Sequence, residues 1–190
     1  MTNEIPEAVP SGPLSRVVVT KIEAAQRQLD EAIALFFEMR DVLSIHTLAC
    51  AASQITADLL TKVGSSSIIR SGALIKSERR KEVLAIFAKP ENFLKHANRD
   101  PDDTLSFNPD ITPFFVFSTA LELTQLGRPS WPGHVFQRWF LLRYPHLIQD
   151  PGPLSEFIRV SRIQNVTTED RDLFLEMVRN GPPPEWPAVT

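Results

Sequence analysis

The densest polar stretch of the chain, residues 92–103, contains the residue types that bind anions and transfer protons. A histidine titrates near neutral pH, and lysine and arginine side chains bind oxyanions. We therefore expect a small-anion site here, formed by Lys95, His96, Asn98, Arg99 and Asp100. The structural alternative is that the same side chains cap helices and form an ion pair that fixes a loop.

A second candidate is His46, which lies at the margin of an apolar helix face and one turn before the single cysteine, Cys50. Such a spacing allows a Cys/His dyad, although small-residue packing is the alternative role for this cysteine. His46, His96 and Asp100 would together supply ligand types for a metal, but the chain has no metal-binding spacing such as HExxH. It also has no glycine-rich phosphate loop. We therefore predict no metal and no cofactor.

The interval between Glu122 and Asp150 contains no acidic residue but several arginines, histidines and aromatic residues. Interleaved basic and aromatic side chains are typical of surfaces that follow a phosphate backbone and stack on bases. Helical spacing instead assigns Phe136, Trp139 and Phe140 to the core, which leaves a few arginines at the rim. Packing is therefore the preferred interpretation of this interval.

The composition favours helices as the elements that position these residues. The chain has 190 residues, of which 43% are hydrophobic and 23% charged, which suffices for one globular domain. Seven glycines against sixteen prolines suit helices interrupted by proline better than strands joined by glycine turns. The formal net charge of −3 gives no general excess of basic residues for nucleic acid or an anionic membrane. We predict an all-α fold, a helical bundle of about seven or eight helices.

Two amphipathic segments, residues 21–39 and 42–63, form the centre of the predicted bundle. A capping box of Thr20 and Glu23 precedes the first, in which apolar residues recur every three or four positions. The break between the segments is so short that they should fold back as an antiparallel N-terminal hairpin. A flank of small residues on the second helix predicts close approach of another helix, from this chain or from a second copy. The flank consists of His46, Cys50, Ser53 and Ala57.

A charged helix is predicted over residues 76–88. Its expected buried side consists of Val83, Leu84, Ile86 and Phe87. Because proline interrupts a helix interior, Pro90 is expected to begin a separate turn of helix over residues 91–96.

The following helix is predicted to begin at Asn108-Pro109 or Thr112-Pro113, since proline is favoured in the first turn. Its expected core stripe consists of Phe114, Phe117 and Leu121. Further helices are expected near residues 133–143, after Pro153, and from Thr167 or Thr168 to about Gly181.

The predicted organisation is one helical domain over residues 20–181, between a flexible tail at 1–19 and a proline-rich tail at 182–190. The first residues lack the basic and apolar regions of a signal peptide, and no apolar run approaches about 18 residues. A single cysteine cannot form an internal disulfide. These features predict a cytoplasmic protein with no membrane partner.

Three stretches resemble a family of small uncharacterised bacterial proteins: AQRQLDEAIALFF at 25–37, SIHTLA at 44–49 and NFLKHANRDPD at 92–102. This resemblance covers about residues 20–145 and implies a helical fold without an established activity. More distantly, the helical hairpin resembles the HEPN superfamily, whose active members are metal-independent RNases that use an arginine followed, after four to six residues, by a histidine. Arg40 and His46 have five residues between them. The resemblance implies that Arg40 would hold the scissile phosphate and His46 would act as the base.

Three functional hypotheses follow. The leading one is a non-catalytic partner-binding or regulatory protein that uses a partner or self-association surface, with the small-residue flank as one candidate. The alternative is a HEPN-like endoribonuclease acting through Arg40 and His46, the only case in which RNA would be a partner. The third is a protein that binds a small anion at Lys95, His96 and Arg99.

Overall fold

The chain forms an all-helical bundle, as its composition predicts. The computed structural model describes residues 16–72, 75–98, 101–147 and 153–184, and within these ranges it contains seven α-helices and no strand. The predicted tails lie mostly outside these ranges. The α-helices are α1 (Lys21–Phe37), α2 (Val42–Lys62), α3 (Ser77–Lys95), α4 (Thr112–Gln125), α5 (Trp131–Arg143), α6 (Pro153–Ile163) and α7 (Arg171–Asn180), with short 3₁₀ helices η1 (Pro109–Ile111) and η2 (Pro145–Leu147).

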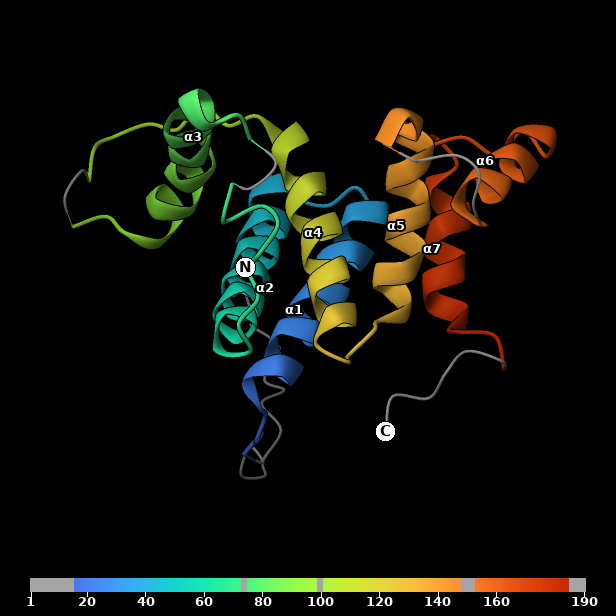
Figure 1. Cartoon of the computed structure of the whole chain (residues 1–190), viewed down its shortest axis with the longest axis horizontal. Coiled ribbons are helices and arrows are strands. Elements are labelled where there is room, and N and C mark those ends of the chain that lie inside the picture. The colour runs from blue at the N-terminus through green and yellow to red at the C-terminus, as the bar shows by residue number, and fades with distance from the viewer. Residues whose placement is uncertain (1–15, 73–74, 99–100, 148–152, 185–190) are drawn as a thin grey trace, which may run out of the picture.

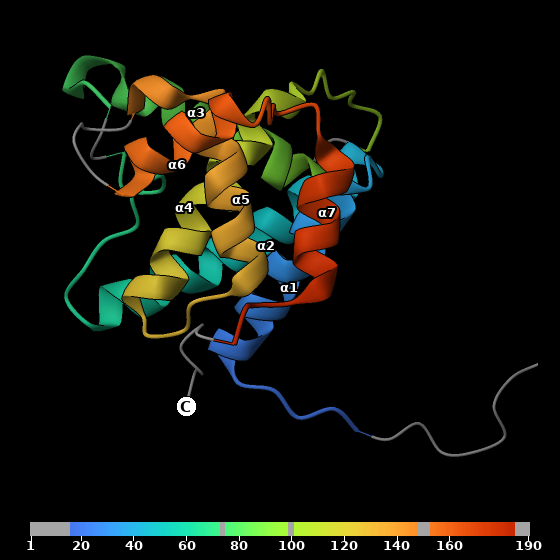
Figure 2. The same cartoon turned by 90° about the vertical axis from the view of Figure 1, so that its right-hand side faces the viewer.

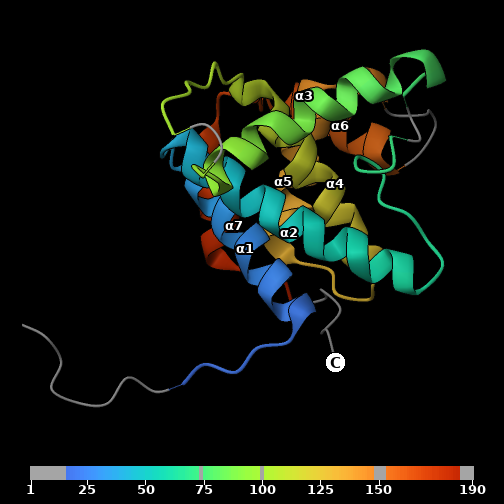
Figure 3. The same ribbon diagram turned by 90° about the vertical axis from the view of Figure 1, so that its left-hand side faces the viewer.

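The helices α1 and α2 pack side by side and run in opposite directions, which forms the predicted hairpin (Figures 1 and 3). The predicted capping box begins α1, because the Glu23 amide donates to the Thr20 hydroxyl and the Thr20 amide donates to the Glu23 carboxylate. At the other end Met39 adopts a left-handed conformation with φ of 53°, and the Arg40 amide donates to the Leu35 carbonyl. This Schellman-type end reverses the chain within four residues.

The other helices surround this hairpin. The helices α4 and α5 pack against each other and against α1, and α7 closes the side formed by α1 and α5 (Figure 2). Phe37, Phe136, Trp139 and Phe174 form the aromatic centre where these helices meet. α3 lies at the edge of the bundle beside α2 (Figures 1 and 3). No helix in the described ranges has the length and apolar character needed to cross a membrane.

The prediction for residues 76–96 was wrong in two respects. First, α3 continues through Pro90, whose ring is buried, and this packing offsets the hydrogen bond that proline cannot donate. Second, Pro90 is the only buried residue of this helix, while Ile86 is 53% exposed and Phe87 is half-buried. The apolar side of α3 is therefore only half-buried against the bundle, where the Phe87 ring meets the Phe115 ring edge-on at 5.6 Å between centroids.

The predicted core stripe of α4 was also wrong. Phe114 is 38% exposed, and Phe117 and Leu121 are only half-buried. The core face of α4 is instead formed by Phe115, Val116, Ala120 and Leu123, because α4 lies between α1, α2 and α5. The aromatic stripe of α4, which consists of Phe114, Phe117 and Leu121, consequently faces the space between α4 and α3.

A buried carboxylate connects α4, α2 and the segment that follows α2. Glu122 is 1% exposed, and its oxygens accept hydrogen bonds from the hydroxyls of Thr56 (2.5 Å), Ser67 (2.6 Å) and Ser118 (2.9 Å) and from the Ile68 amide (3.2 Å). Four donors compensate for removal of the carboxylate from water. This network fixes residues 67–70 against the bundle.

Replacing Glu122 with Ala should lower the free energy of unfolding by roughly 3–5 kcal/mol, because the buried donors lose their common acceptor. Urea unfolding followed by circular dichroism measures this change. Glu82→Ala is the matched control, since Glu82 is 57% exposed in its ion pair with Arg79 and should contribute less than about 1 kcal/mol. Equal losses for the two variants would contradict a structural role for the Glu122 network.

Candidate functional site

His46 lies inside the bundle, on the side of α2 that packs against α4. Its side chain is fully buried, with Nδ1 3.0 Å from the Thr112 hydroxyl and Nε2 3.3 Å from the Cys50 sulfur. The rings of Phe107 and Phe115 lie against the imidazole. The Cys/His pair that the spacing allows is thus formed, and both ring nitrogens of His46 are occupied.

The surroundings keep both members of this pair neutral. Burial lowers the pKa of His46 to about 4, because a protonated imidazole would lose its hydration. Burial likewise raises the pKa of the Cys50 thiol to about 12, with a smaller contribution from the Glu91 carboxylate. A nucleophilic cysteine requires a depressed thiol pKa and access to substrate. This pair has neither, and its geometry serves packing.

Arg40 and His46 occupy different environments, although only five residues separate them in the sequence. Arg40 is exposed at the reversal between α1 and α2, whereas His46 is enclosed by α2, α4 and residues before η1. A general base must come within hydrogen-bond reach of the proton that it abstracts. In this conformation an RNA phosphate held by Arg40 has no access to the imidazole, so the geometry does not favour the RNase hypothesis.

The small-residue flank of α2 is covered within the chain. His46, Cys50, Ser53 and Ala57 are all buried. α4 packs on α2, and Arg70 donates from Nε to the Ser53 hydroxyl (3.0 Å) and from Nη2 to the Cys50 carbonyl (2.9 Å). The close helix approach that the small residues predict therefore occurs inside one chain, and it leaves this flank inaccessible to a second copy.

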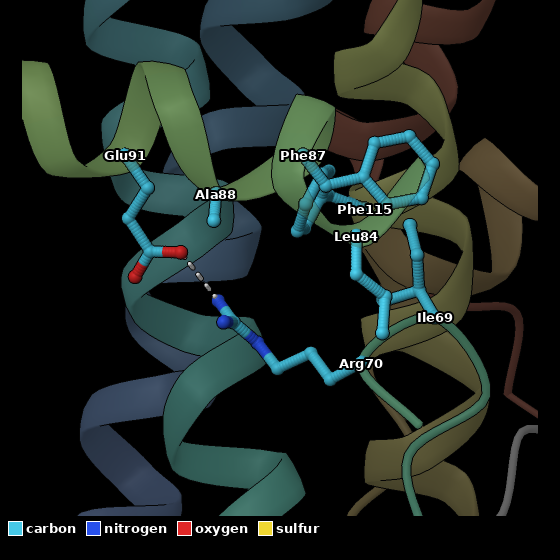
Figure 4. A pocket seen from close by; sticks show the side chains of 7 residues that line it. All are labelled: Ile69, Arg70, Leu84, Phe87, Ala88, Glu91 and Phe115. Atoms are coloured by element: carbon cyan, nitrogen blue, oxygen red, sulfur yellow. Dashed lines mark hydrogen bonds and ion pairs between the residues drawn. The ribbon is translucent and has the colours of Figure 1, made fainter. Parts of the chain in front are cut away.

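Arg70 and Glu91 form a charged pair beside a small cavity (Figure 4). This cavity is bounded by α3, by α4 and by the segment that follows α2. Their Nη2 and Oε2 atoms lie 3.2 Å apart, and Glu91 also accepts from Lys95 at 2.6 Å. Lys95 and Arg70 lower the pKa of Glu91 despite its partial burial, which by itself would raise it. This pair is the polar connection that holds the C-terminal half of α3 beside α2.

The predicted small-anion site is only partly within the described residues. Lys95 is engaged by Glu91, while His96 and Asn98 are exposed and line a polar hollow that also contains Asp103. Arg99 and Asp100 lie outside the described ranges. Among described residues no group of three or more histidine, cysteine, aspartate or glutamate side chains is arranged to hold a metal.

An apolar cavity of about 460 Å³ lies between α3, α4 and α5. Its wall includes the aromatic stripe of α4, together with Val83 and Phe87 from α3. Ser118 is the one polar lining residue, and its hydroxyl already donates to Glu122. The described residues that line it are Ile68, Ile69, Ile75, Val83, Phe87, Phe114, Phe117, Ser118, Leu121, Phe140, Leu141 and Leu147.

The aromatic residues of the basic interval serve mainly as core. Phe136, Trp139 and Phe140 are buried as predicted, and the Trp139 indole donates to the Thr168 carbonyl at 3.0 Å. Arg143 remains exposed at the end of α5. A surface of stacked aromatic and basic residues for nucleic acid is thus not assembled by these three rings.

Comparison of the chain with protein-family models, with curated proteins and with solved structures finds no match. Functional inference therefore depends on the geometry described above.

Sequence reasoning missed the two most connected polar residues, Glu122 and Arg70. Neither residue belongs to a sequence motif, because their partners are distant in sequence. Glu122 accepts a hydrogen bond from Thr56, and Arg70 donates one to Glu91. One available signal was a single acid within the apolar α4 sequence TPFFVFSTALELTQ, since an acid on such a helix needs compensation if it is buried.

Burial of His46 makes stability depend on pH. The folded chain keeps His46 neutral down to about pH 4, whereas an unfolded histidine binds a proton near pH 6.5. The unfolded state therefore takes up the proton first, and stability should fall as the pH is lowered from about 6.5 to about 4.

We expect His46 to reduce the free energy of unfolding by about 2 kcal/mol at pH 5 relative to pH 7. Burial of His134 acts in the same direction, while burial of Asp30, whose pKa is raised to about 6, acts in the opposite one. Urea unfolding of the wild type and of His46→Gln at both pH values isolates the contribution of His46. An unchanged pH dependence in the variant would contradict burial of a neutral imidazole.

Proposed function

We propose that this chain is a non-catalytic binding protein and that the cavity between α3, α4 and α5 holds the hydrocarbon chain of a fatty acid. The supporting observation is the character of its wall, in which eleven of the twelve described lining residues are apolar. Its volume of about 460 Å³ falls within the range of small-molecule sites, roughly 300–1,000 Å³.

The lining favours hydrocarbon over any polar ligand. Ser118 is the single hydroxyl in the wall, and Glu122 already accepts its hydrogen bond. A sugar, nucleotide or amino acid placed there would lose hydrogen bonds to water without replacing them. Each buried methylene group instead contributes about 0.8 kcal/mol.

The two helices that face each other across the cavity also support this proposal. Val83 and Phe87 of α3 and the aromatic stripe of α4 line the cavity, and none of these side chains is fully buried. An apolar surface of this kind favours apolar ligands, because their contact removes apolar area of both from water. A ligand would complete a packing interface that these two helices leave open.

The charges of α3 suit an acidic head group. The first turns of this helix and the residue before it contain Lys76, Arg79, Arg80 and Lys81 against Glu78 and Glu82. Arg80 lies one helical turn before the lining residue Val83 and donates to the Gly72 carbonyl at 3.0 Å. A carboxylate on the outer end of the hydrocarbon chain would thus lie near cationic side chains.

Isothermal titration calorimetry with monomeric dodecanoate tests this function. Val83→Trp places an indole in the cavity, and because it displaces about two methylene groups of the ligand it should weaken binding by about tenfold. Ile86→Trp is the matched control on the same helix, since Ile86 is 53% exposed and does not line the cavity. Circular dichroism verifies that both variants remain folded.

Absence of dodecanoate binding to the wild type would refute the proposal. Equal affinities of the two tryptophan variants would also refute it, because they would place the bound chain elsewhere.

A further inference from the structure

A second cavity, of about 270 Å³, lies at the turn between α1 and α2, on the side occupied by α5 and α7. Three arginines from separate segments line it. Arg40 comes from the turn itself, Arg143 from the last residue of α5, and Arg171 from the first residue of α7. Three arginines from segments distant in sequence therefore line one small space.

Most of the hydrogen-bonding capacity of these guanidinium groups is unused. Arg171 donates from Nη1 to the Phe36 carbonyl at 3.1 Å, and its guanidinium carbon lies 4.8 Å from the centre of the Phe36 ring. Arg143 interacts with the Tyr144 side chain through a hydrogen bond, with its guanidinium carbon 5.8 Å from the centre of the Tyr144 ring, and it is 3.9 Å from an Asp110 oxygen in a loose and exposed ion pair. Arg40 is exposed, and its side chain forms no hydrogen bond or ion pair with any described residue. A guanidinium group has five N–H donors, so an additional acceptor can be bound by all three.

The backbone at this turn is strained in a way that fixes the position of Arg40. Met39, which also lines the cavity, has a φ of 53°, a conformation that side chains other than glycine rarely adopt. The bonds from the Glu38, Met39 and Arg40 amides to carbonyls of α1 hold the turn in this form.

The acidic groups near the cavity do not neutralise it. Among the described lining residues Asp110 carries the single carboxylate, and its side chain is 72% exposed. The Asp41 carboxylate is occupied by the Ser44 amide and hydroxyl at the start of α2. Glu169 contributes an attraction to Arg143 from outside the lining. Within the wall itself, three cations face one anion.

The rest of the wall is apolar. Phe36, Trp139, Ile45 and Pro113 form its inner part, and the exposed thioether of Met39 lies at its edge. Inorganic phosphate alone would leave this surface uncovered. A ligand with an anionic end and an apolar end matches both parts of the wall.

We propose that this cavity binds an organic phosphomonoester, with the phosphate among Arg40, Arg143 and Arg171 and the apolar group against Phe36 and Met39. A phosphomonoester carries close to two negative charges and three acceptor oxygens at neutral pH. It therefore offers three guanidinium groups more charge and more acceptors than a carboxylate does. This site is separate from the fatty acid cavity, and it does not depend on that proposal.

Calorimetric titration of the full chain with phenyl phosphate at low ionic strength tests this inference. Arg40→Ala should weaken binding by about tenfold or more, because it removes a charge-assisted contact. Since Arg40 is exposed and without a described partner, this variant should retain the wild-type melting temperature. Arg79→Ala, which removes an exposed arginine from α3, and Val83→Trp should both bind phenyl phosphate as the wild type does.

A second variant, Arg143→Gln, keeps a polar side chain of similar length and should also weaken binding. Inorganic phosphate and phenol, each supplying one half of the ligand, should both bind more weakly than phenyl phosphate. Three results would overturn the proposal: no binding to the wild type at millimolar phenyl phosphate, equal affinity for Arg40→Ala, or equal affinity for inorganic phosphate.

Discussion

The buried carboxylate of Glu122 accepts four hydrogen bonds, and these bonds determine much of the geometry around α3. Glu122 holds Ser67 and the Ile68 amide against α4, and this fixes the backbone that leads to Arg70. Arg70 in turn binds the Cys50 carbonyl and Glu91, so the position of α3 depends on a carboxylate that it never touches. Polar contacts of the segment after α2 thus help to position α3, and the Phe87–Phe115 ring contact joins α3 to α4 on the apolar side.

The sequence was sufficient for features that depend on neighbouring residues. The capping box at Thr20 and Glu23, the tight reversal after α1 and the all-helical class follow from local hydrogen bonding and apolar periodicity. The side of α4 that becomes core could not be predicted in this way. Periodicity identifies an apolar stripe at Phe114, Phe117 and Leu121, but the neighbours of a helix decide whether its stripe packs against protein or faces a cavity.

Candidate sites were harder to predict than helices for a related reason. His46 and Cys50 were recognised by type and spacing, yet burial deprives both of charge and therefore of reactivity. Conversely, Arg143 and Arg171 have no motif, and they join Arg40 only because α5 ends where α7 begins beside the α1–α2 turn. The two proposed sites also differ in chemistry, since one offers almost no hydrogen bonds and the other offers many.

The burial of Cys50 has a practical consequence. Cys50 is 1% exposed, its sulfur faces His46, and burial raises the pKa of its thiol to about 12. Maleimides and oxidants react with thiolates, so the native fold shields its one sulfhydryl from them. A cysteine engineered on the surface would consequently be the single reactive position of the folded molecule, and dyes or spin labels could be attached there without first removing the natural thiol.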